Sequence, residues 1–362
     1  MAADKRFLTI HEIVKKARLR LNQTSWDYLI GGTETETTLK RNRSSLERLA
    51  LRPKVLNDVS SVDASGEFFG EKVRLPVCLA PIGSLQVFEA GGGASASVAA
   101  GEFGVANMAS SVCEPSLEEI AAASGSPKVY QLYVRGDEDW TDAVIERAIA
   151  SGYKAFCLTV DTAVVSRRER DMAKRVVPTS MPADPGDIVY QARLNWGEVE
   201  RIRTKYDIPL VLKGINRADD AVRAVNAGVD VVYISNHGGR QLDHGPGSID
   251  LLPEIREAIG SDPTIAIDGG FYRGTDILKA KALGADWIGL GRLEAWSMAA
   301  GGAPAVVRAL EILEDEVHES MALCGVRNWD ELDASFISPA EAVDDPGLSS
   351  AFPLLDVTDP GY

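Results

Sequence analysis

The residues with the clearest capacity for chemistry are His237 and Arg240, which lie three positions apart on a glycine-containing loop. The loop follows the largely apolar run 229–233, so a buried strand is expected to deliver both side chains to its end. Histidine exchanges a proton near neutral pH, and the planar guanidinium of arginine matches a carboxylate. The pair therefore suits proton abstraction from a small acid. A surface histidine and arginine on a simple turn are the alternative interpretation.

A second pair of loops has the composition of an anion site. Gly269 and Gly270 precede Arg273, and Gly291 precedes Arg292 after a later apolar run. Glycines let backbone N–H groups approach an anion closely, and the arginines supply positive charge. The loops therefore predict a phosphate site, although the glycines could merely form tight turns.

Eight short apolar runs alternate with alanine-rich or amphipathic segments of helical length. The runs span residues 77–82, 105–109, 129–134, 155–160, 210–212, 231–234, 264–267 and 287–290. This alternation is typical of parallel βα units, and eight units favour a closed (β/α)8 TIM barrel in the α/β class. A doubly wound sheet is the alternative, but no glycine fingerprint for a dinucleotide follows the first run.

The chain is expected to form one domain over residues 1–362. Its predicted parts are an N-terminal helical and hairpin segment at 1–75, the barrel at 76–325 and a peripheral C-terminal tail at 326–362. The long connection 163–208 carries Pro178, Pro182, Pro185 and Gly186. A proline-containing loop at the catalytic end of a barrel predicts a lid.

Composition excludes several functional classes. The chain has 362 residues, 45% of them hydrophobic, and a formal net charge of −15. This charge argues against nucleic acid or an anionic membrane as the main partner. Cys78, Cys113, Cys157 and Cys324 show no paired spacing, which indicates reduced thiols. Without a signal peptide or an apolar run of about 18 residues, a cytoplasmic protein with no membrane segment is expected.

Polar residues concentrate where the apolar runs end, and in a barrel these ends form the face that carries the chemistry. They are Ser110, Gln131, Tyr133, Thr159, Asp161, Lys213, Ser235, His237, Arg240, Asp268 and Arg292. The bodies of the runs stay apolar, so packing alone does not explain the pattern.

Several motifs carry a family resemblance. The most specific is Ser-Asn-His-Gly-Gly-Arg-Gln-Leu-Asp at 235–243, supported by Gln-Leu-Tyr at 131–133, Thr-Val-Asp-Thr at 159–162, Leu-Lys-Gly at 212–214 and Asp-Gly-Gly at 268–270. In these motifs the chain resembles the FMN-dependent α-hydroxy-acid oxidases and dehydrogenases, which include glycolate oxidase, lactate oxidase and mandelate dehydrogenase. The resemblance covers nearly the whole barrel and the N-terminal helical part. It implies FMN as cofactor and oxidation of an L-2-hydroxy acid to the 2-keto acid.

The resemblance implies four catalytic residues. His237 is expected to be the base, and Asp161 to stabilise its imidazolium form. Tyr133 would hydrogen-bond the reacting oxygen. Lys213 would lie beside the flavin and favour its anionic reduced form through a fixed positive charge. A charge at the end of a buried strand needs an anion or a functional reason.

The resemblance also implies a substrate clamp. Arg240 and Arg168 would hold the substrate carboxylate, and Tyr28 and Tyr133 would add hydroxyl groups. Two alternatives remain at this stage. Asp161 and Arg168 could form a surface ion pair, and Tyr28 could be a core aromatic of an N-terminal helix.

For the cofactor, the resemblance implies contacts from most of the strand ends. The residues are Pro81, Ile82, Gly83, Ser110, Gln131, Thr159, Lys213, Ser235, Asp268, Gly269, Gly270, Arg273, Gly291 and Arg292. The last six lie in or next to the two glycine loops, and Gly270, Arg273, Gly291 and Arg292 would hold the phosphate. Gln131 and Thr159 could instead be ordinary polar residues at strand ends. No metal site is expected.

The chain departs from the family pattern near the flavin. Val112 aligns with a tryptophan of glycolate-type members, and Gly83 with an alanine of several oxidases. Both changes remove volume, so a bulkier hydroxy acid, branched or aromatic, is expected. Tyr272 stands where an arginine usually precedes Arg273, which affects the expected phosphate site.

Two further functions are weighed against the hydroxy-acid enzyme. One is another FMN barrel enzyme such as an isoprenyl-diphosphate isomerase, and the other is a flavin-binding protein without turnover. Neither explains His237 and the arginines as a carboxylate-binding acid–base site. The sequence leaves the electron acceptor open among oxygen, a quinone and a redox protein, and the resemblance suggests a homotetramer.

Overall fold

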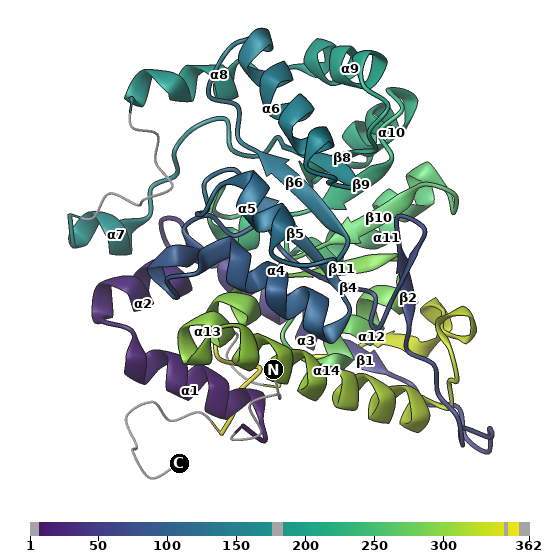
Figure 1. The fold of residues 1–362 in the computed structure, drawn as a ribbon. Helices are drawn as coiled ribbons and strands as arrows, with labels where there is room; N and C mark the ends of the chain where they lie inside the picture. The colour runs from purple at the N-terminus through teal and green to yellow at the C-terminus, as the bar shows by residue number, and fades with distance from the viewer. Residues whose placement is uncertain (1–6, 176–183, 344–346, 355–362) are drawn as a thin grey trace.

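Eight parallel strands close into a barrel at the centre of the molecule (Figure 1). The computed structural model describes residues 7–175, 184–343 and 347–354. Around the barrel the strands are β4 (Val77–Leu79), β5 (Ala106–Ser110), β6 (Lys128–Leu132), β7 (Ala155–Thr159), β8 (Leu210–Ile215), β9 (Val231–Ile234), β10 (Thr264–Ile267) and β11 (Trp287–Leu290). Pairing of β11 with β4 closes the ring. The predicted (β/α)8 barrel is confirmed.

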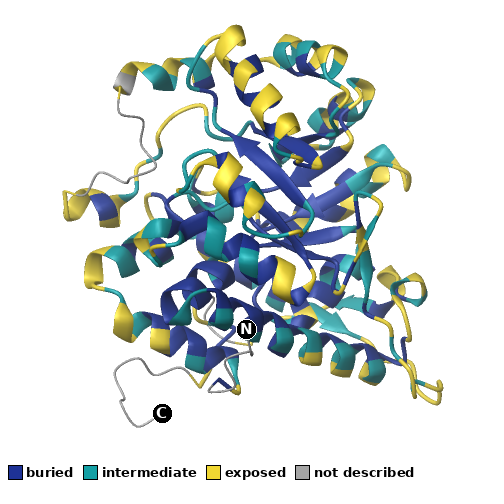
Figure 2. Ribbon diagram, in the orientation of Figure 1, coloured by how far each residue is buried: buried dark blue, intermediate teal, exposed yellow. Residues whose placement is uncertain are grey.

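Helices surround the barrel and bury its outer face. They are α4 (Gly92–Phe103), α5 (Leu117–Ala122), α6 (Glu138–Ala150), α9 (Trp196–Lys205), α10 (Ala218–Asn226), α11 (Ser248–Ile259), α12 (Gly274–Ala282), α13 (Arg292–Gly301) and α14 (Ala303–Cys324). Figure 2 shows buried strands at the centre and exposed residues on the outer sides of the helices. Strands covered on both sides are apolar throughout, which explains the continuous apolar runs of the sequence.

Three N-terminal helices pack beside the barrel, as the sequence predicts. They are α1 (Ile10–Arg20), α2 (Gln23–Ile30) and α3 (Thr37–Glu47). A capping box between Thr9 and Glu12 starts α1, because the two side chains satisfy free N–H groups of the first turn. Helix α1 lies against α13, and α3 lies against the loop that carries His237. The N-terminal segment thereby helps to position the candidate site.

The hairpin expected before the barrel closes its N-terminal end. Strands β2 (Gly66–Phe68) and β3 (Glu71–Val73) pair antiparallel. Phe68 is buried in the barrel interior and packs on Trp287 at 4.8 Å between ring centroids. Access to the interior is therefore from the opposite, C-terminal end.

The segment after α14 returns to the body of the protein. Strand β12 (Ile337–Pro339) pairs antiparallel with β1 (Leu49–Leu51). Further on, Phe352 is buried, with its ring stacked on Tyr272 at 5.7 Å. The sequence predicts a peripheral tail here, and the structure gives part of it buried contacts.

The connection predicted as a lid contains α7 (Glu169–Ala173), α8 (Ile188–Ala192) and α9. Pro178 and Pro182 lie outside the described residues. None of the helices in the described ranges has the length and apolar character that a membrane crossing requires.

Candidate active site

One large cavity opens at the C-terminal end of the barrel. Its volume is about 1430 Å³ when the open mouth and the solvent space in front of it are included. The predicted site residues that line it are Tyr28, Pro81, Ile82, Gly83, Tyr133, Arg168, Lys213, His237, Arg240, Asp268, Gly269, Gly270, Gly291 and Arg292. The structure thus brings together, around one cavity, residues that span most of the sequence.

Six buried polar residues form a ring beneath the cavity, and two of them, Lys213 and Asp268, also line it. The ring consists of Ser110, Gln131, Thr159, Lys213, Ser235 and Asp268. Each stands two positions after an apolar residue of the barrel interior, namely Met108, Val129, Cys157, Val211, Tyr233 and Ala266. Since side chains alternate along a strand, the ring members point into the barrel at its open end. Strand periodicity alone therefore builds this ring.

Hydrogen bonds organise the polar ring into two parts. Gln131 Nε2 donates to Thr159 Oγ1 at 2.9 Å. Lys213 Nζ donates to Ser235 Oγ at 2.8 Å, and Ser235 donates in turn to Asp268 at 2.6 Å. The Gln131 Oε1 atom is buried and has no partner among the described residues. A buried polar atom needs a hydrogen bond, so Gln131 is placed to receive one from a ligand.

Lys213 is a permanent cation at the floor of the cavity. Its Nζ lies 3.2 Å from Asp268. Burial lowers the pKa of Lys213, but Asp268 and Asp161 outweigh burial and raise it above its ordinary value. A fixed positive charge in a dry site stabilises negative charge that develops nearby.

The loop after β9 holds His237 in an uncommon backbone conformation. His237 has a φ of 56°, and Gly238 and Gly239 also have positive φ. Asn236 caps the turn by accepting from Gly239 N–H. A side chain at Gly239 would approach the backbone of Leu39 to 2.5 Å, so glycine is required where α3 packs on the loop. The positive φ of His237 is a strained conformation for a residue other than glycine, and such strain is typical of functional sites.

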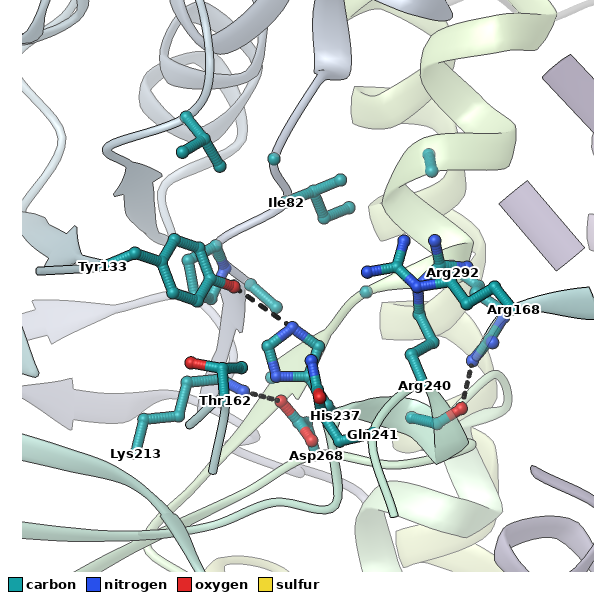
Figure 3. Close-up of a pocket in the computed structure, with 18 of the residues that line it drawn as sticks. Ile82, Tyr133, Thr162, Arg168, Lys213, His237, Arg240, Gln241, Asp268 and Arg292 are labelled. Atoms are coloured by element: carbon teal, nitrogen blue, oxygen red, sulfur yellow. Dashed lines mark hydrogen bonds and ion pairs between the residues drawn. The ribbon is translucent and has the colours of Figure 1, made fainter. Parts of the chain in front are cut away.

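His237 lies between a carboxylate and a phenol. Its Nδ1 is 3.3 Å from Asp161 Oδ1, and its Nε2 is 3.1 Å from Tyr133 Oη. An ionised carboxylate only accepts hydrogen bonds, so Asp161 places the imidazole proton on Nδ1 and leaves Nε2 as the basic atom. Tyr133 and Lys213 are visible around His237 in Figure 3.

The electrostatics of the pair suit a general base. Burial lowers the pKa of His237 below its ordinary value, although Asp161 acts to raise it. Burial acts to raise the pKa of Asp161, but His237 and Lys213 hold it below its ordinary value. At neutral pH the histidine is therefore neutral and the carboxylate ionised, which is the state needed to accept a proton.

Three arginines meet on the other side of His237 (Figure 3). Arg240 donates to the carbonyls of Tyr28 and Gly31 at 2.7 and 2.9 Å. Arg292 donates to the carbonyls of Gly31 and Gly238, both at 2.9 Å. Burial, together with the nearby Arg168, lowers the pKa of Arg240 to about 9. Crowded, half-buried cations favour an anion beside them, so this side of the cavity suits an anionic group.

Tyr28 contributes its ring as well as its hydroxyl. The Arg240 guanidinium lies 5.0 Å from the ring centroid of Tyr28. The hydroxyl is 3.4 Å from Ser84 Oγ. Tyr28 is thus part of the cavity wall next to Arg240.

The structure does not bring Arg273 into the cavity. Its guanidinium forms an ion pair with Glu316 at 2.6 Å and donates to the carbonyl of Ala351 at 3.1 Å. The backbone N–H groups of Tyr272 and Arg273 donate to Asp276. The N-terminus of α12 is therefore occupied by carboxylates of the protein itself. Tyr272 lines the cavity in place of an arginine.

Gln191 and Asp171 are among the residues in and near the site that were not predicted. Gln191 in α8 accepts from Val134 N–H and donates to the Thr159 carbonyl, both at 2.7 Å, and so ties the lid connection to two strand ends. Asp171 in α7 is buried, and burial raises its pKa although Arg240 and Arg168 act to lower it. Neither residue belongs to a motif or a strand end, so no sequence pattern points to them.

The residues present fit a flavin mononucleotide. The unpartnered Gln131 Oε1 and the fixed Lys213 charge suit a polar ring system that becomes anionic on reduction. Arg292 and the glycine turns at 269–270 and 291 border the same cavity, and they suit a phosphate.

Comparison with known proteins agrees with this fit. Residues 17–339 match the family described as FMN-dependent dehydrogenase. The chain is 37% identical to an L-lactate oxidase from Nostoc sp., over 91% of this chain and 98% of that protein. It is 36% identical to a 4-hydroxymandelate oxidase from Amycolatopsis orientalis, over 88% and 95%.

A solved structure shares the same architecture. The crystal structure of a mandelate oxidase superposes with a TM-score of 0.86 at 35% sequence identity, covering 93% of this chain and 100% of that chain. Similarity of this extent covers the barrel, the N-terminal helices and the loops of the cavity together.

Proposed function

Because the chain belongs to the family of FMN-dependent dehydrogenases, and is thus an FMN-dependent 2-hydroxy-acid oxidoreductase, we propose the following roles for its residues. His237 is the base, and Arg240 with Arg168 binds the substrate carboxylate. The observation that carries the proposal is the arrangement itself. A neutral histidine oriented by Asp161 faces a group of half-buried arginines, and the nearby Arg168 helps to lower the pKa of Arg240.

The substrate carboxylate neutralises the arginine side of the cavity. Arg240 is already fixed by two backbone carbonyls, so little order is lost when the anion binds. Arg168 adds a second guanidinium, and Tyr28 a hydroxyl. This clamp would place the substrate's α-carbon and hydroxyl beside His237.

His237 Nε2 receives the proton of the substrate hydroxyl. Tyr133 Oη, now 3.1 Å from that nitrogen, would turn to hydrogen-bond the reacting oxygen. Asp161 stabilises the resulting imidazolium through the opposite ring nitrogen. FMN, when bound, supplies the two-electron acceptor for the oxidation.

The polar ring and the cavity floor hold the cofactor. We assign Ser110, Gln131 and Thr159 to the flavin edge, Lys213 to its anionic side, and Ser235 with Asp268 to the ribityl chain. Pro81, Ile82 and Gly83 line the flavin face. The phosphate is assigned to Gly269, Gly270, Gly291 and Arg292, and Arg273 is omitted because Glu316 holds its guanidinium.

The preferred substrate carries a branched or aromatic side chain. The lining of the cavity includes five apolar residues, Phe88, Val112, Val134, Val164 and Ile188. An apolar wall favours a substrate that removes apolar surface from water. The relatives named for mandelate and hydroxymandelate support the aromatic choice.

Oxygen is proposed as the electron acceptor, since the relatives are named as oxidases. A quinone or a redox protein would give slow reoxidation in air.

We further propose a cytoplasmic homotetramer. The four cysteines are unpaired, which suits a reducing compartment. The molar mass measured by light scattering tests the tetramer.

The test is anaerobic addition of a panel of L-2-hydroxy acids to the purified yellow protein. Bleaching by mandelate or branched acids in preference to glycolate supports the proposal, and rapid return of colour in air identifies an oxidase. Turnover of a prenyl diphosphate would favour an isomerase instead. A yellow protein that no hydroxy acid bleaches would point to flavin binding without turnover.

A further inference from the structure

Tyr233 is a large polar side chain that the proposed chemistry does not use. It belongs to β9 and is fully buried inside the barrel, one layer below the polar ring. Its register partners on the neighbouring strands are Lys213 in β8 and Ala266 in β10. Tyr233 thus lies directly under the cavity floor.

The ring of Tyr233 contacts the ammonium group of Lys213. The Lys213 Nζ atom is 5.1 Å from the ring centroid. On its other side the ring packs edge-on against Trp287, at 5.5 Å and an interplanar angle of 75°. A cation over a desolvated aromatic ring is held by the ring quadrupole, and Trp287 fixes the ring in that position.

The hydroxyl of Tyr233 occupies space that only glycine leaves free. A Cβ atom at Gly289 would lie 1.9 Å from Tyr233 Oη and 3.2 Å from Asp268 Cβ. Burial, with Asp268 nearby, raises the pKa of Tyr233 well above the ordinary value. The tyrosine is therefore neutral and stands beside the carboxylate that pairs with Lys213.

The ammonium group of Lys213 sits at the boundary between the cavity floor and the barrel interior. Asp268 at 3.2 Å and Ser235 at 2.8 Å hold the ammonium group at the cavity floor, and the barrel interior beneath it is the other place that the flexible side chain could occupy. The Tyr233 ring fills the space beneath Lys213, so the ammonium cannot sink into the barrel.

We propose that Tyr233 is a positioning residue that holds the charge of Lys213 at the cavity floor and thereby raises the reduction potential of the bound flavin. The inference rests on the proposed placement of FMN over Lys213. Removing the ring lets the ammonium withdraw from the floor. We expect this to weaken the stabilisation of the reduced over the oxidised cofactor about tenfold, which is a fall of about 30 mV for a two-electron couple.

The experiment measures the reduction potential of the flavin in four purified holoenzymes. Tyr233→Leu removes the ring, and Tyr233→Phe keeps the ring but removes the hydroxyl. Tyr130→Leu is the matched control, because Tyr130 is a buried barrel tyrosine that packs on Tyr153 and Phe156. Lys213→Met removes the charge itself. FMN release on dilution, followed by fluorescence, is measured in parallel.

The proposal expects a lower potential in Tyr233→Leu and Lys213→Met and an unchanged one in Tyr233→Phe and Tyr130→Leu. A shift in Lys213→Met without one in Tyr233→Leu overturns the role of Tyr233 alone. An equal shift in Tyr233→Phe also overturns it, because the hydroxyl would then be responsible. No shift in Lys213→Met removes the proposed cofactor placement, and the inference with it. If Tyr233→Leu does not fold, Tyr233→Met, whose flexible side chain fills gaps, replaces it.

Discussion

Replacing Asp161 by asparagine isolates the charge that supports His237. Asp161 Oδ1 is 3.3 Å from His237 Nδ1, and the Asp161 side chain is only 10% exposed. In the proposed reaction His237 gains a proton in the step that oxidises the substrate, so a positive charge forms beside this carboxylate. Asparagine has nearly the same shape and keeps an oxygen for the hydrogen bond but lacks the negative charge.

The size of the effect follows from the separation. Two unit charges 3.3 Å apart interact by about 5 kcal/mol at an effective dielectric constant of about 20. The hydrogen bond that remains in Asp161→Asn and rearrangement of nearby dipoles offset part of this energy. We therefore expect a loss of about 3–4 kcal/mol in transition-state stabilisation, or a rate lower by about 10²–10³-fold.

The assay is anaerobic stopped-flow reduction of the bound flavin by saturating substrate. Asp142→Asn is the control, because Asp142 pairs with Arg201 and Lys205 and does not line the cavity. The pH profile adds a second check. Since Asp161 acts to raise the pKa of His237, the variant should reach its neutral-base plateau at lower pH. A reduction rate within threefold of the parent, with FMN bound, would refute the reasoning.

Three other predictions concern stability, specificity and the lid. Burial raises the pKa of Glu294 well above its ordinary value of 4.5, so the folded protein keeps it protonated and loses stability as pH rises above about 4.5. Glu294→Gln should therefore gain stability over the parent between pH 5 and pH 8 in urea unfolding, and parallel curves would contradict this. Val112 lines the cavity, and Val112→Trp should lower kcat/KM for mandelate relative to glycolate by about tenfold or more; an unchanged ratio would show that Val112 does not limit substrate size. Glu36 binds Arg170 through two contacts of 2.5 and 2.7 Å and so ties α7 to the N-terminal segment. Glu36→Arg should raise KM about two- to fivefold, and adding Arg170→Glu should restore most of it, whereas failure of the charge swap to rescue would remove the pair from substrate binding.

The barrel and the polar ring could be predicted because both depend on local periodicity. Apolar runs of strand length give the strands, and the alternation of side chains carries Gln131, Thr159 and Lys213 to the open end. The loop at 235–243 was predicted for a different reason. A histidine and an arginine follow an apolar run there on a glycine-containing loop, and the motif resembles that of the FMN-dependent α-hydroxy-acid oxidases and dehydrogenases.

The parts that could not be predicted depend on contacts between residues distant in sequence. The direction of the Arg273 guanidinium is set by Glu316, which follows it by 43 residues. Gln191 reaches Thr159 from the far side of the lid connection. Phe352 is buried against the rings of His11, Tyr272 and Trp296, which come from distant parts of the chain. No local pattern in the chain encodes these encounters.

The most direct test of the account is the single substitution His237→Ala. Loss of the base should lower the rate of anaerobic flavin reduction by more than about 10³-fold, while FMN binding, measured by fluorescence titration, stays within about threefold because the polar ring is intact. His244→Ala serves as the control, since its ring is 63% exposed and plays no part in the proposed chemistry. Rapid reduction by a hydroxy acid in the His237→Ala protein would contradict the central claim that this histidine removes the substrate proton.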